Sequence, residues 1–475
     1  MASPNEPVLV AGVDSSTQSV KIVIRNGVTG ELVRSGRAAH PTGTEVDPEA
    51  WWLALQEAIA VAGGLDDVAA ISIGGQQHGM VALDSEGNVI RPALLWNDTR
   101  SAQAAADLND EYEKLHEGES IAVAVGSRLV AAFTASKVRW LADHEPENAD
   151  RVAALALPHD WLSWKLSGST SISGLFTDRS DASGTGYFDP VSGDYRRDIL
   201  ALALKSDREI ILPRVLSPFE IAAVTPGGTA IGVGCGDNAG AALGVGAQTG
   251  DVVVSLGTSG TAFSVSTTPT HDRRGYVAGF DDATGKFLPL VCTLNAARIL
   301  DAGARILGLS LDEFGERALS AEPGAGGLTL LPYFEGERTP DRPGATGTLT
   351  GLTLSNSTPE NLARAMIEGM LCGLVDAVSQ LETQGVDVKR ILIIGGAAKN
   401  PAIPLIASAL FGKPVYLPQI GEYVADGAAK QAAWALLGTE PQWSNSAMDV
   451  VEAEHSAVVM ERYLSLVDQT KIWSR

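Results

Sequence analysis

Two glycine-rich stretches in the middle of the chain hold the residues with the clearest capacity for chemistry. The first, VGCGDNAGAALG from Val233, places one carboxylate, Asp237, among glycines that leave room for a substrate close to the backbone. The second, SLGTSGT from Ser255, offers hydroxyls and free amide groups at a tight turn. A carboxylate that accepts a proton beside a loop that binds a phosphate is what phosphoryl transfer to an alcohol requires.

The carboxylate of Asp237 also has a purely structural interpretation. The following Ala/Gly-rich segment is compatible with a helix, so Asp237 could serve as its N-cap. The two roles are compatible, because the helix dipole at this position favours the ionised form that a general base needs.

The loop after Ser255 has two interpretations as well. Gly257 and Gly260 let the backbone approach a phosphate, and Thr258 and Ser259 add hydroxyl donors. An ordinary glycine turn would look the same, and no lysine follows the glycines as it does in a Walker A loop.

A similar polar turn occurs near the N-terminus. Asp14 ends an apolar run over residues 8–13, and the small polar residues Ser15, Ser16 and Thr17 follow. Asp14 could hold Mg²⁺ through water while the next amides face phosphate oxygens. The alternative is an Asx turn that stabilises a hairpin.

Further polar groups follow apolar runs at other points of the chain. The stretch GGAAKN, Gly395 to Asn400, could face an adenosine or simply connect a strand to a helix. A polyol requires paired donors and acceptors beside an aromatic wall, and each such residue taken singly could instead be structural. Candidates of this kind are His78 in GGQQHG, the trio Trp96, Asn97 and Asp98, and Asp181 in SDASGT.

The elements that must position these residues alternate between strands and helices, which indicates an α/β fold. Strands are predicted at residues 8–13, 20–24, 32–38, 68–73, 252–254, 262–265 and 391–394, and helices begin at Pro48 and Pro359 after capping residues. Each half opens with a strand, a polar turn and a strand, so we predict a duplicated architecture. The predicted division is a tail at 1–7, a first domain at 8–246 and a second at 247–475.

Length, charge and cysteine content exclude several classes of protein. The 475 residues exceed one typical core, and the net charge of −22 argues against nucleic acid and anionic membranes as partners. The three cysteines lack the spacing of a zinc site or a disulfide framework, and the N-terminus lacks the features of a signal peptide. A cytoplasmic protein is expected.

Taken together, these motifs resemble the FGGY family of carbohydrate kinases over nearly the whole chain. FTASKVRWL from Phe133 and GTLTGLTLSNSTPENLARAMIEG from Gly347 are similar to the two family signatures. GGQQHGM, LLWNDTR, GCGDNAGAA, SLGTSGT and LLPYFEGERTP resemble motifs of members that act on D-xylulose. The resemblance implies two actin-like ATPase domains of the ribonuclease H-like type, with a cleft between them.

The resemblance also implies roles for individual residues, with MgATP as the phosphoryl donor. Asp237 corresponds to the catalytic base, and Asp14, with Ser16 and Thr17, to the Mg²⁺ and phosphate loop. The nucleotide-binding positions are Gly257, Thr258, Ser259, Gly395, Gly396, Ala397 and Asn400, with Thr258 at the γ-phosphate. The sugar-facing positions are His78, Gly79, Trp96, Asn97, Asp98 and Asp237. The chain departs from the family pattern at Ala397 where glycine is common, at His159 where lysine is common, and at Ser136 where proline is common.

The expected reaction is transfer of the γ-phosphoryl group of ATP to the 5-hydroxyl of the ketopentose D-xylulose, with Asp237 accepting the hydroxyl proton. One alternative is the same chemistry on ribulose, ribitol or gluconate. Another is a non-enzymatic actin-like protein that binds ATP for assembly or switching, for which Asp237 and a polar pocket would be unnecessary. The sequence is compatible with a homodimer but does not fix the number of subunits.

Overall fold

The computed structural model describes residues 8–443 and 448–472, and within them the chain forms two compact units. The first unit takes in the described residues through Gly246, together with Thr267–Leu288 and the described part of Gly421–Asn445. The second takes in Ala247–Ser266, Pro289–Ile420 and the described residues from 448 onward. The sequence division assigned 267–288 and 421–445 to the second domain, whereas these segments lie in the first unit. The predicted tail at 1–7 lies outside the described residues.

The first unit is built on a mixed sheet with the order β13-β14-β5-β1-β2-β3. β1 is antiparallel to β2 and parallel to β5, and β15 pairs with the end of β5. The strands of this sheet are β1 (Leu9–Ser15), β2 (Ser19–Asn26), β3 (Leu32–Ala39), β5 (Val68–Gly75), β13 (Ile221–Val224), β14 (Ala230–Gly232) and β15 (Cys235–Gly236). The predicted opening pair of strands around Asp14 is therefore confirmed.

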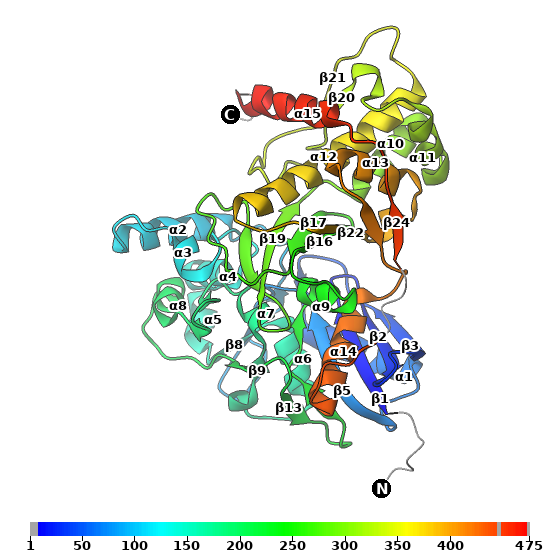
Figure 1. The fold of residues 1–475 in the computed structure, drawn as a ribbon. Coiled ribbons are helices and arrows are strands. Elements are labelled where there is room, and N and C mark those ends of the chain that lie inside the picture. Colours follow the sequence, from blue (N-terminus) through cyan, green and yellow to red (C-terminus); the bar gives the residue numbers. More distant parts are fainter. Residues whose placement is uncertain (1–7, 444–447, 473–475) are drawn as a thin grey trace. The chain divides into compact units, whose positions relative to one another are not determined.

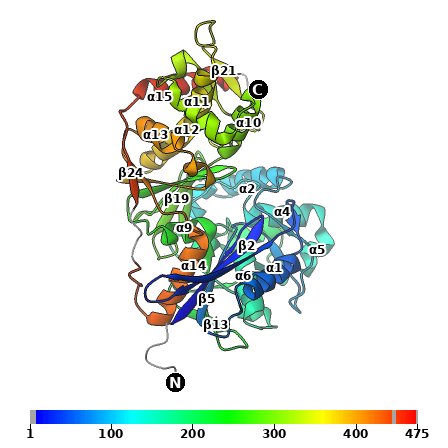
Figure 2. The same ribbon diagram turned by 90° about the vertical axis from the view of Figure 1, so that its right-hand side faces the viewer.

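Helices cover both faces of this sheet, with α1 and α6 on one side and α14 on the other (Figures 1 and 2). The alternating side chains of β1 explain the two layers, because Leu9, Ala11 and Val13 enter one core and Val10 enters the other. The helices of this unit are α1 (Pro48–Val61), α2 (Ala102–Leu115), α3 (Ile121–Val125), α4 (Thr134–His144), α5 (Pro146–Arg151), α6 (Pro158–Leu166), η1 (Ile172–Gly174), α7 (Arg179–Ala182), α8 (Arg197–Leu204), α9 (Asp237–Gly244) and α14 (Tyr423–Leu437).

Short strands complete the first unit. They form two-stranded pairs: β4 (Glu45–Val46), β6 (Val81–Leu83), β7 (Ala93–Leu94), β8 (Ala154–Ala156), β9 (Phe176–Thr177), β10 (Phe188–Asp189), β11 (Asp194–Tyr195) and β12 (Arg214–Val215). The segment Thr267–Leu288 contains β18 (Ala278–Asp281), which pairs with β19 in the other large sheet.

Helix α14 belongs to the first unit because its small residues fit closely against α9 and β1. A Cβ added at Gly427 would lie 1.9 Å from the carbonyl oxygen of Gly240, and one at Gly12 would lie 1.9 Å from that of Ala425. Side chains at these positions would separate the elements, so glycine allows backbone to pack directly on backbone.

The second unit repeats the order of the first. Its sheet runs β19-β17-β16-β22-β23-β24, with two antiparallel pairs, then two parallel pairs, then an antiparallel edge. The first sheet shows the same succession from β3 through β2, β1, β5 and β14 to β13. The strands are β16 (Asp251–Leu256), β17 (Gly260–Ser264), β19 (Phe287–Thr293), β20 (Thr329–Leu331), β21 (Thr348–Thr350), β22 (Arg390–Ile394), β23 (Val415–Leu417) and β24 (Asp449–Val451).

The helices of the second unit include the predicted long helix, whose first residue, Pro359, follows the N-cap Thr358 as expected. They are α10 (Ala297–Leu307), α11 (Leu311–Ser320), η2 (Ala325–Gly327), α12 (Pro359–Thr383), η3 (Gly396–Lys399), α13 (Ala402–Phe411), α15 (Ala457–Gln469) and η4 (Thr470–Ile472). No helix of the described chain is both long enough and apolar enough to cross a membrane.

The three cysteines are buried as free thiols at Cys235, Cys292 and Cys372. Burial raises the pKa of the Cys235 and Cys372 thiols well above the ordinary value. Cys235 therefore acts as a small core residue beside Asp237.

Candidate active site

The carboxyl ends of three adjacent parallel strands bring the predicted acidic residues of the first unit together. In the register, Asp14 of β1 lies opposite Gly74 of β5, and Gly236 of β15 lies opposite Gly75. Asp237 follows Gly236 directly and begins α9. Two carboxylates from distant parts of the sequence thus meet at one edge of the sheet, the usual place for ligand sites in parallel sheets.

Asp14 is buried and held by two neighbours. The Ser16 hydroxyl donates to Oδ1 at 2.5 Å, and the Lys21 ammonium lies 3.6 Å from Oδ2. Burial raises the pKa of Asp14, although the Ser16 hydrogen bond and the Lys21 charge oppose this rise. Lys21 also pairs with Glu422 at 2.6 Å.

Asp237 is the first residue of α9 and not its N-cap, which is Gly236. Desolvation, with the nearby charge of Asp14, raises the pKa of Asp237 to about 7, although hydrogen bonds from Asn238 lower it. The helix dipole favours the ionised form, but α9 is short and desolvation outweighs its dipole. A carboxylate with this pKa is well matched to proton transfer near neutral pH.

Some of the predicted sugar-facing residues connect to the Asp14 loop. Trp96 Nε1 donates to Thr17 Oγ1 at 2.9 Å, and that hydroxyl donates to Gln76 Oε1 at 3.2 Å. Gln76 Nε2 donates and Asn97 Oδ1 accepts no hydrogen bond within the described chain, although both atoms are buried.

The neighbouring predicted residues make hydrogen bonds and packing contacts within the protein. Asp98 accepts hydrogen bonds from Thr44 at 2.7 Å and from Arg100 Nε at 2.9 Å, and these bonds lower its pKa although burial opposes them. The His78 ring lies against Phe133 and Phe280, and its Nδ1 bonds the Gly184 carbonyl at 2.5 Å. Gly79 approaches Pro158, since an added Cβ would lie 2.7 Å from the proline ring.

A buried ionic cluster lies behind these strands. The His159 ring places Nδ1 2.5 Å from Asp181 Oδ2 and Nε2 3.3 Å from Asp160 Oδ1. The two carboxylates raise the pKa of His159 to about 10 even though burial alone would lower it. The imidazole is therefore a cation at neutral pH, and Asp181 is a partner in an ion pair.

The second unit holds the predicted nucleotide loops. Gly257, Thr258 and Ser259 form the turn between β16 and β17, and Gly395 and Gly396 follow the adjacent parallel strand β22. A Cβ at Gly395 would lie 2.5 Å from the Leu256 carbonyl oxygen, so Gly395 packs directly against the end of β16, where the first loop begins. Ala397 lies in η3, while Asn400 directs its side chain to Leu311 and to the start of α13.

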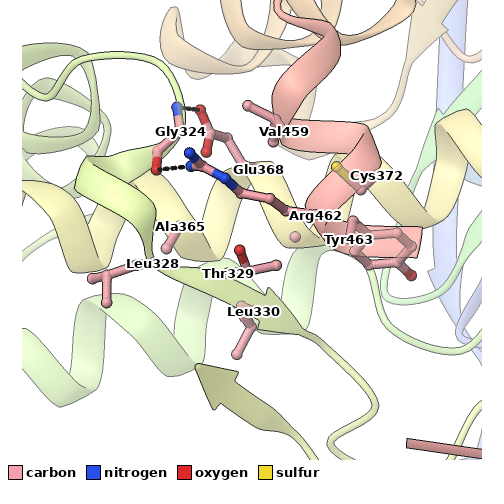
Figure 3. Close-up of a pocket in the computed structure, with 11 residues that line it drawn as sticks. Gly324, Leu328, Thr329, Leu330, Ala365, Glu368, Cys372, Val459, Arg462 and Tyr463 are labelled. Carbon is pink, nitrogen blue, oxygen red and sulfur yellow. Dashed lines mark hydrogen bonds between the residues drawn. The ribbon is translucent and has the colours of Figure 1, made fainter. Parts of the chain in front are cut away.

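A separate small cavity in the second unit lies among α12, α15 and β20 (Figure 3). Glu368 accepts from the Gly324 amide at 2.9 Å and from Arg364 at 2.6 Å, and Arg462 reaches the Gly324 carbonyl. None of the sequence-predicted site residues lines this cavity, so we assign it to the packing of the fold.

Sequence reasoning missed four residues of the first unit: Lys21, Gln76, Gln77 and Asn238. A signal existed for Lys21, which interrupts an apolar strand and lies opposite Asp14 in the hairpin register. The two glutamines and the asparagine lie within the motifs GGQQHG and VGCGDNAGAALG, but only the folded structure shows their contacts.

Comparisons with known proteins agree with this architecture. The N-terminal and C-terminal domain models of the FGGY family of carbohydrate kinases match residues 9–254 and 252–436. A xylulose kinase of Streptomyces coelicolor is 42% identical over 470 residues, 95% of this chain and 94% of that protein. The crystal structure of xylulose kinase from Bifidobacterium adolescentis shares 48% identity at a TM-score of 0.90, over 97% of this chain and 99% of that one.

A more distant comparison concerns the fold alone. The structure of Plasmodium falciparum glycerol kinase with ADP covers 98% of this chain at a TM-score of 0.84, with 19% identity. Together these likenesses confirm the predicted fold of two actin-like α/β units.

Proposed function

Because the chain belongs to the FGGY family of carbohydrate kinases, we propose that it transfers the γ-phosphoryl group of ATP to the 5-hydroxyl of D-xylulose. The observation that carries this proposal is the carboxylate of Asp237, whose pKa of about 7 suits a general base. The names of the similar xylulose kinases support the choice of sugar.

In this mechanism Asp237 is the catalytic base. As the sugar oxygen forms its bond to phosphorus, its proton moves to the Asp237 carboxylate. The bond from phosphorus to the oxygen of ADP breaks, and that oxygen keeps the electron pair. The protein contributes positioning and charge stabilisation more than covalent chemistry.

The remaining residues would bind the two substrates. Asp14, Ser16 and Thr17, with the Lys21 ammonium, are suited to the transferred phosphate, and His78, Gly79, Trp96, Asn97 and Asp98 to the sugar. In the second unit we assign the γ-phosphate to Thr258, with Gly257 and Ser259, and the adenosine to Gly395, Gly396, Ala397 and Asn400.

A magnesium ion fits the Asp14 site by charge and ligand type. The carboxylates of Asp14 and Asp237 interact electrostatically, and oxygen ligands are those that Mg²⁺ prefers. Bound there through water on Asp14, the ion would neutralise phosphate charge.

The test is the Asp237→Asn variant, assayed for sugar-dependent ADP release. We expect kcat to fall by about 10²–10⁴-fold, the usual contribution of a general base, while Asp198→Asn on the surface of α8 stays near wild type. Activity of Asp237→Asn within a few-fold of wild type would exclude the base role.

A panel of D-xylulose, D-ribulose, ribitol, gluconate and glycerol in the same assay tests the sugar. The highest kcat/KM is expected for D-xylulose. ATP-dependent polymerisation without sugar-stimulated turnover would instead support an actin-like binding protein.

A further inference from the structure

The two oxygens of the Asp237 carboxylate have different surroundings. Oδ1 accepts hydrogen bonds from the backbone amide and from the side-chain Nδ2 of Asn238, both at 2.8 Å. Oδ2 accepts no hydrogen bond from another residue in the described part of the chain. The lone pairs of Oδ1 are thus occupied, whereas those of Oδ2 are free to meet a substrate hydroxyl.

The Asn238 carboxamide is oriented by a second amide side chain. Gln77 Nε2 donates to the Ser180 carbonyl at 3.2 Å, which leaves Gln77 Oε1 to accept from Asn238 Nδ2 at 3.4 Å. Gly236 leaves the space that Gln77 fills, since a Cβ there would lie 2.8 Å from Gln77 Nε2. The nitrogen of Asn238, not its oxygen, therefore faces the carboxylate.

We propose that Asn238 and Gln77 are positioning residues that reserve Oδ2 of Asp237 for the proton of the sugar hydroxyl. This inference rests on the proposed function, in which Asp237 is the base. Asn238 acts directly on the carboxylate, and Gln77 acts through Asn238. The 3.4 Å contact is long for a hydrogen bond, so Gln77 has the smaller effect.

Charged groups on several elements surround this network, and the substitutions leave all of them in place. Asp14 on β1, Asp181 on α7 and Cys235 on β15 interact electrostatically with Asp237. His159 on α6 lies against Gly234, and Lys21 on β2 reaches Asp14. β5 has no titratable residue. On the packed helix α14 and at its N-cap, the charged groups pair elsewhere: Glu422 (the N-cap) with Lys21, Asp426 with Arg25 and Lys430 with Glu440. The phenol of Tyr423 also lies on this helix.

The experiment measures kcat/KM for D-xylulose across about pH 5.5 to 9.5 in the full-length protein. The variants are Asn238→Ala, Gln77→Met and the double variant. Asn88→Ala serves as the matched control, because Asn88 also donates its amide to a carboxylate, that of Asp84, but in a surface turn. Thermal unfolding of each variant establishes that it is folded.

Loss of the Asn238 donor removes a hydrogen bond that favours the ionised carboxylate, so the acidic limb of the pH profile moves to higher pH. A base whose pKa rises by about one is about one-tenth ionised at pH 7, so we expect about a fivefold loss there that disappears near pH 9. Gln77→Met is expected to show part of this change, and the double variant to match Asn238→Ala.

Two results would overturn the inference. One is an equal loss at every pH with an unmoved acidic limb, which would make Asn238 a merely structural residue. The other is an additive double variant, which would show that Gln77 acts independently of Asn238. Should Asn238→Ala fail to fold, the pH profile of Gln77→Met decides. Failure of the proposed function is a separate result, since it appears as activity of Asp237→Asn.

Discussion

His159 shows how a single side chain can make a buried cluster of carboxylates tolerable. It is fully buried between Asp181 and Asp160; its ring lies against Gly234, just before β15, and its Cβ and backbone lie against Gly75 at the end of β5. Without a cation, two carboxylates would remain in the protein interior without compensation, which is costly. His159 stands where lysine is common in the family, and its raised pKa keeps a positive charge at this position.

Replacement of His159 by glutamine is therefore expected to lower the free energy of unfolding by about 3–5 kcal/mol. The pKa of His159 is raised from 6.5 to about 10, so its stabilising charge is fully present below about pH 6.5 and is lost as pH rises through about 10. Burial raises the pKa of Asp160 to about 7 and that of Asp181 to about 6, so both partners are ionised only above this range. The stability difference between wild type and His159→Gln should thus be largest at about pH 7–8 and shrink toward pH 10.

Denaturant unfolding at several pH values measures this difference. The exposed His144→Gln is the control and should change stability by less than about 0.5 kcal/mol. A difference that stays constant from pH 6 to pH 10 would show that His159 is neutral in the folded protein.

At the scale of elements, the sequence predicts where helices begin but not how elements distant in the chain pack together. Helices α1 and α12 begin where capping residues and prolines indicate, with Asp47 accepting from the Glu49 amide at 3.0 Å. Cap chemistry acts within a few residues, so the sequence alone determines it. The place of α14 in the first unit depends on backbone contacts with α9 and β1 that no local pattern contains.

The same division applies to the candidate site. The glycine-rich turns and Asp14 and Asp237 were found from residue type and position. The pKa of Asp237 could not be predicted, because it depends on desolvation and on Asp14, which reaches the site through the pairing of β1, β5 and β15. The hairpin register likewise determines that Lys21 faces Asp14.

The contact between α9 and α14 makes a prediction about glycine. Gly427→Ala would place a methyl group 1.9 Å from the Gly240 carbonyl oxygen, so the helices must separate. We expect the free energy of unfolding to fall by about 1–3 kcal/mol, with a loss of kcat because Asp237 lies on α9.

Gly373→Ala in α12 is the matched control. Its added Cβ would meet only the Tyr463 hydroxyl at 3.5 Å, an ordinary contact, and alanine favours helix by about 0.5–1 kcal/mol. Thermal unfolding compares the two, and equal stability of both variants would refute the packing argument.

For the whole molecule, chain continuity and structural units do not coincide. The first unit includes Thr267–Leu288 and α14, which come later in the chain than residues of the second unit. Its second core joins Val10, Val23 and Ala70 to the α14 residues Ala425, Ala429, Ala432 and Ala433. A fragment chosen by sequence position alone would leave that apolar face of the sheet uncovered.

Two fragments test this dependence. The first joins residues 8–246 to 267–288 by a Gly/Ser linker, and the second adds 421–443 through another linker. We expect cooperative thermal unfolding, followed by circular dichroism, only for the second fragment and the full chain. Cooperative unfolding of the first fragment would show that α14 is dispensable for the unit.

The burial of all three thiols has a practical consequence for site-specific labelling of the protein. A cysteine reacts as its thiolate. Cys235, Cys292 and Cys372 are all buried, and the pKa of the Cys235 and Cys372 thiols is raised as well. The folded protein should consequently resist maleimide. Spectroscopic labels could then be attached to one engineered cysteine in each unit without first removing the natural ones, and distances could be followed as sugar and nucleotide bind.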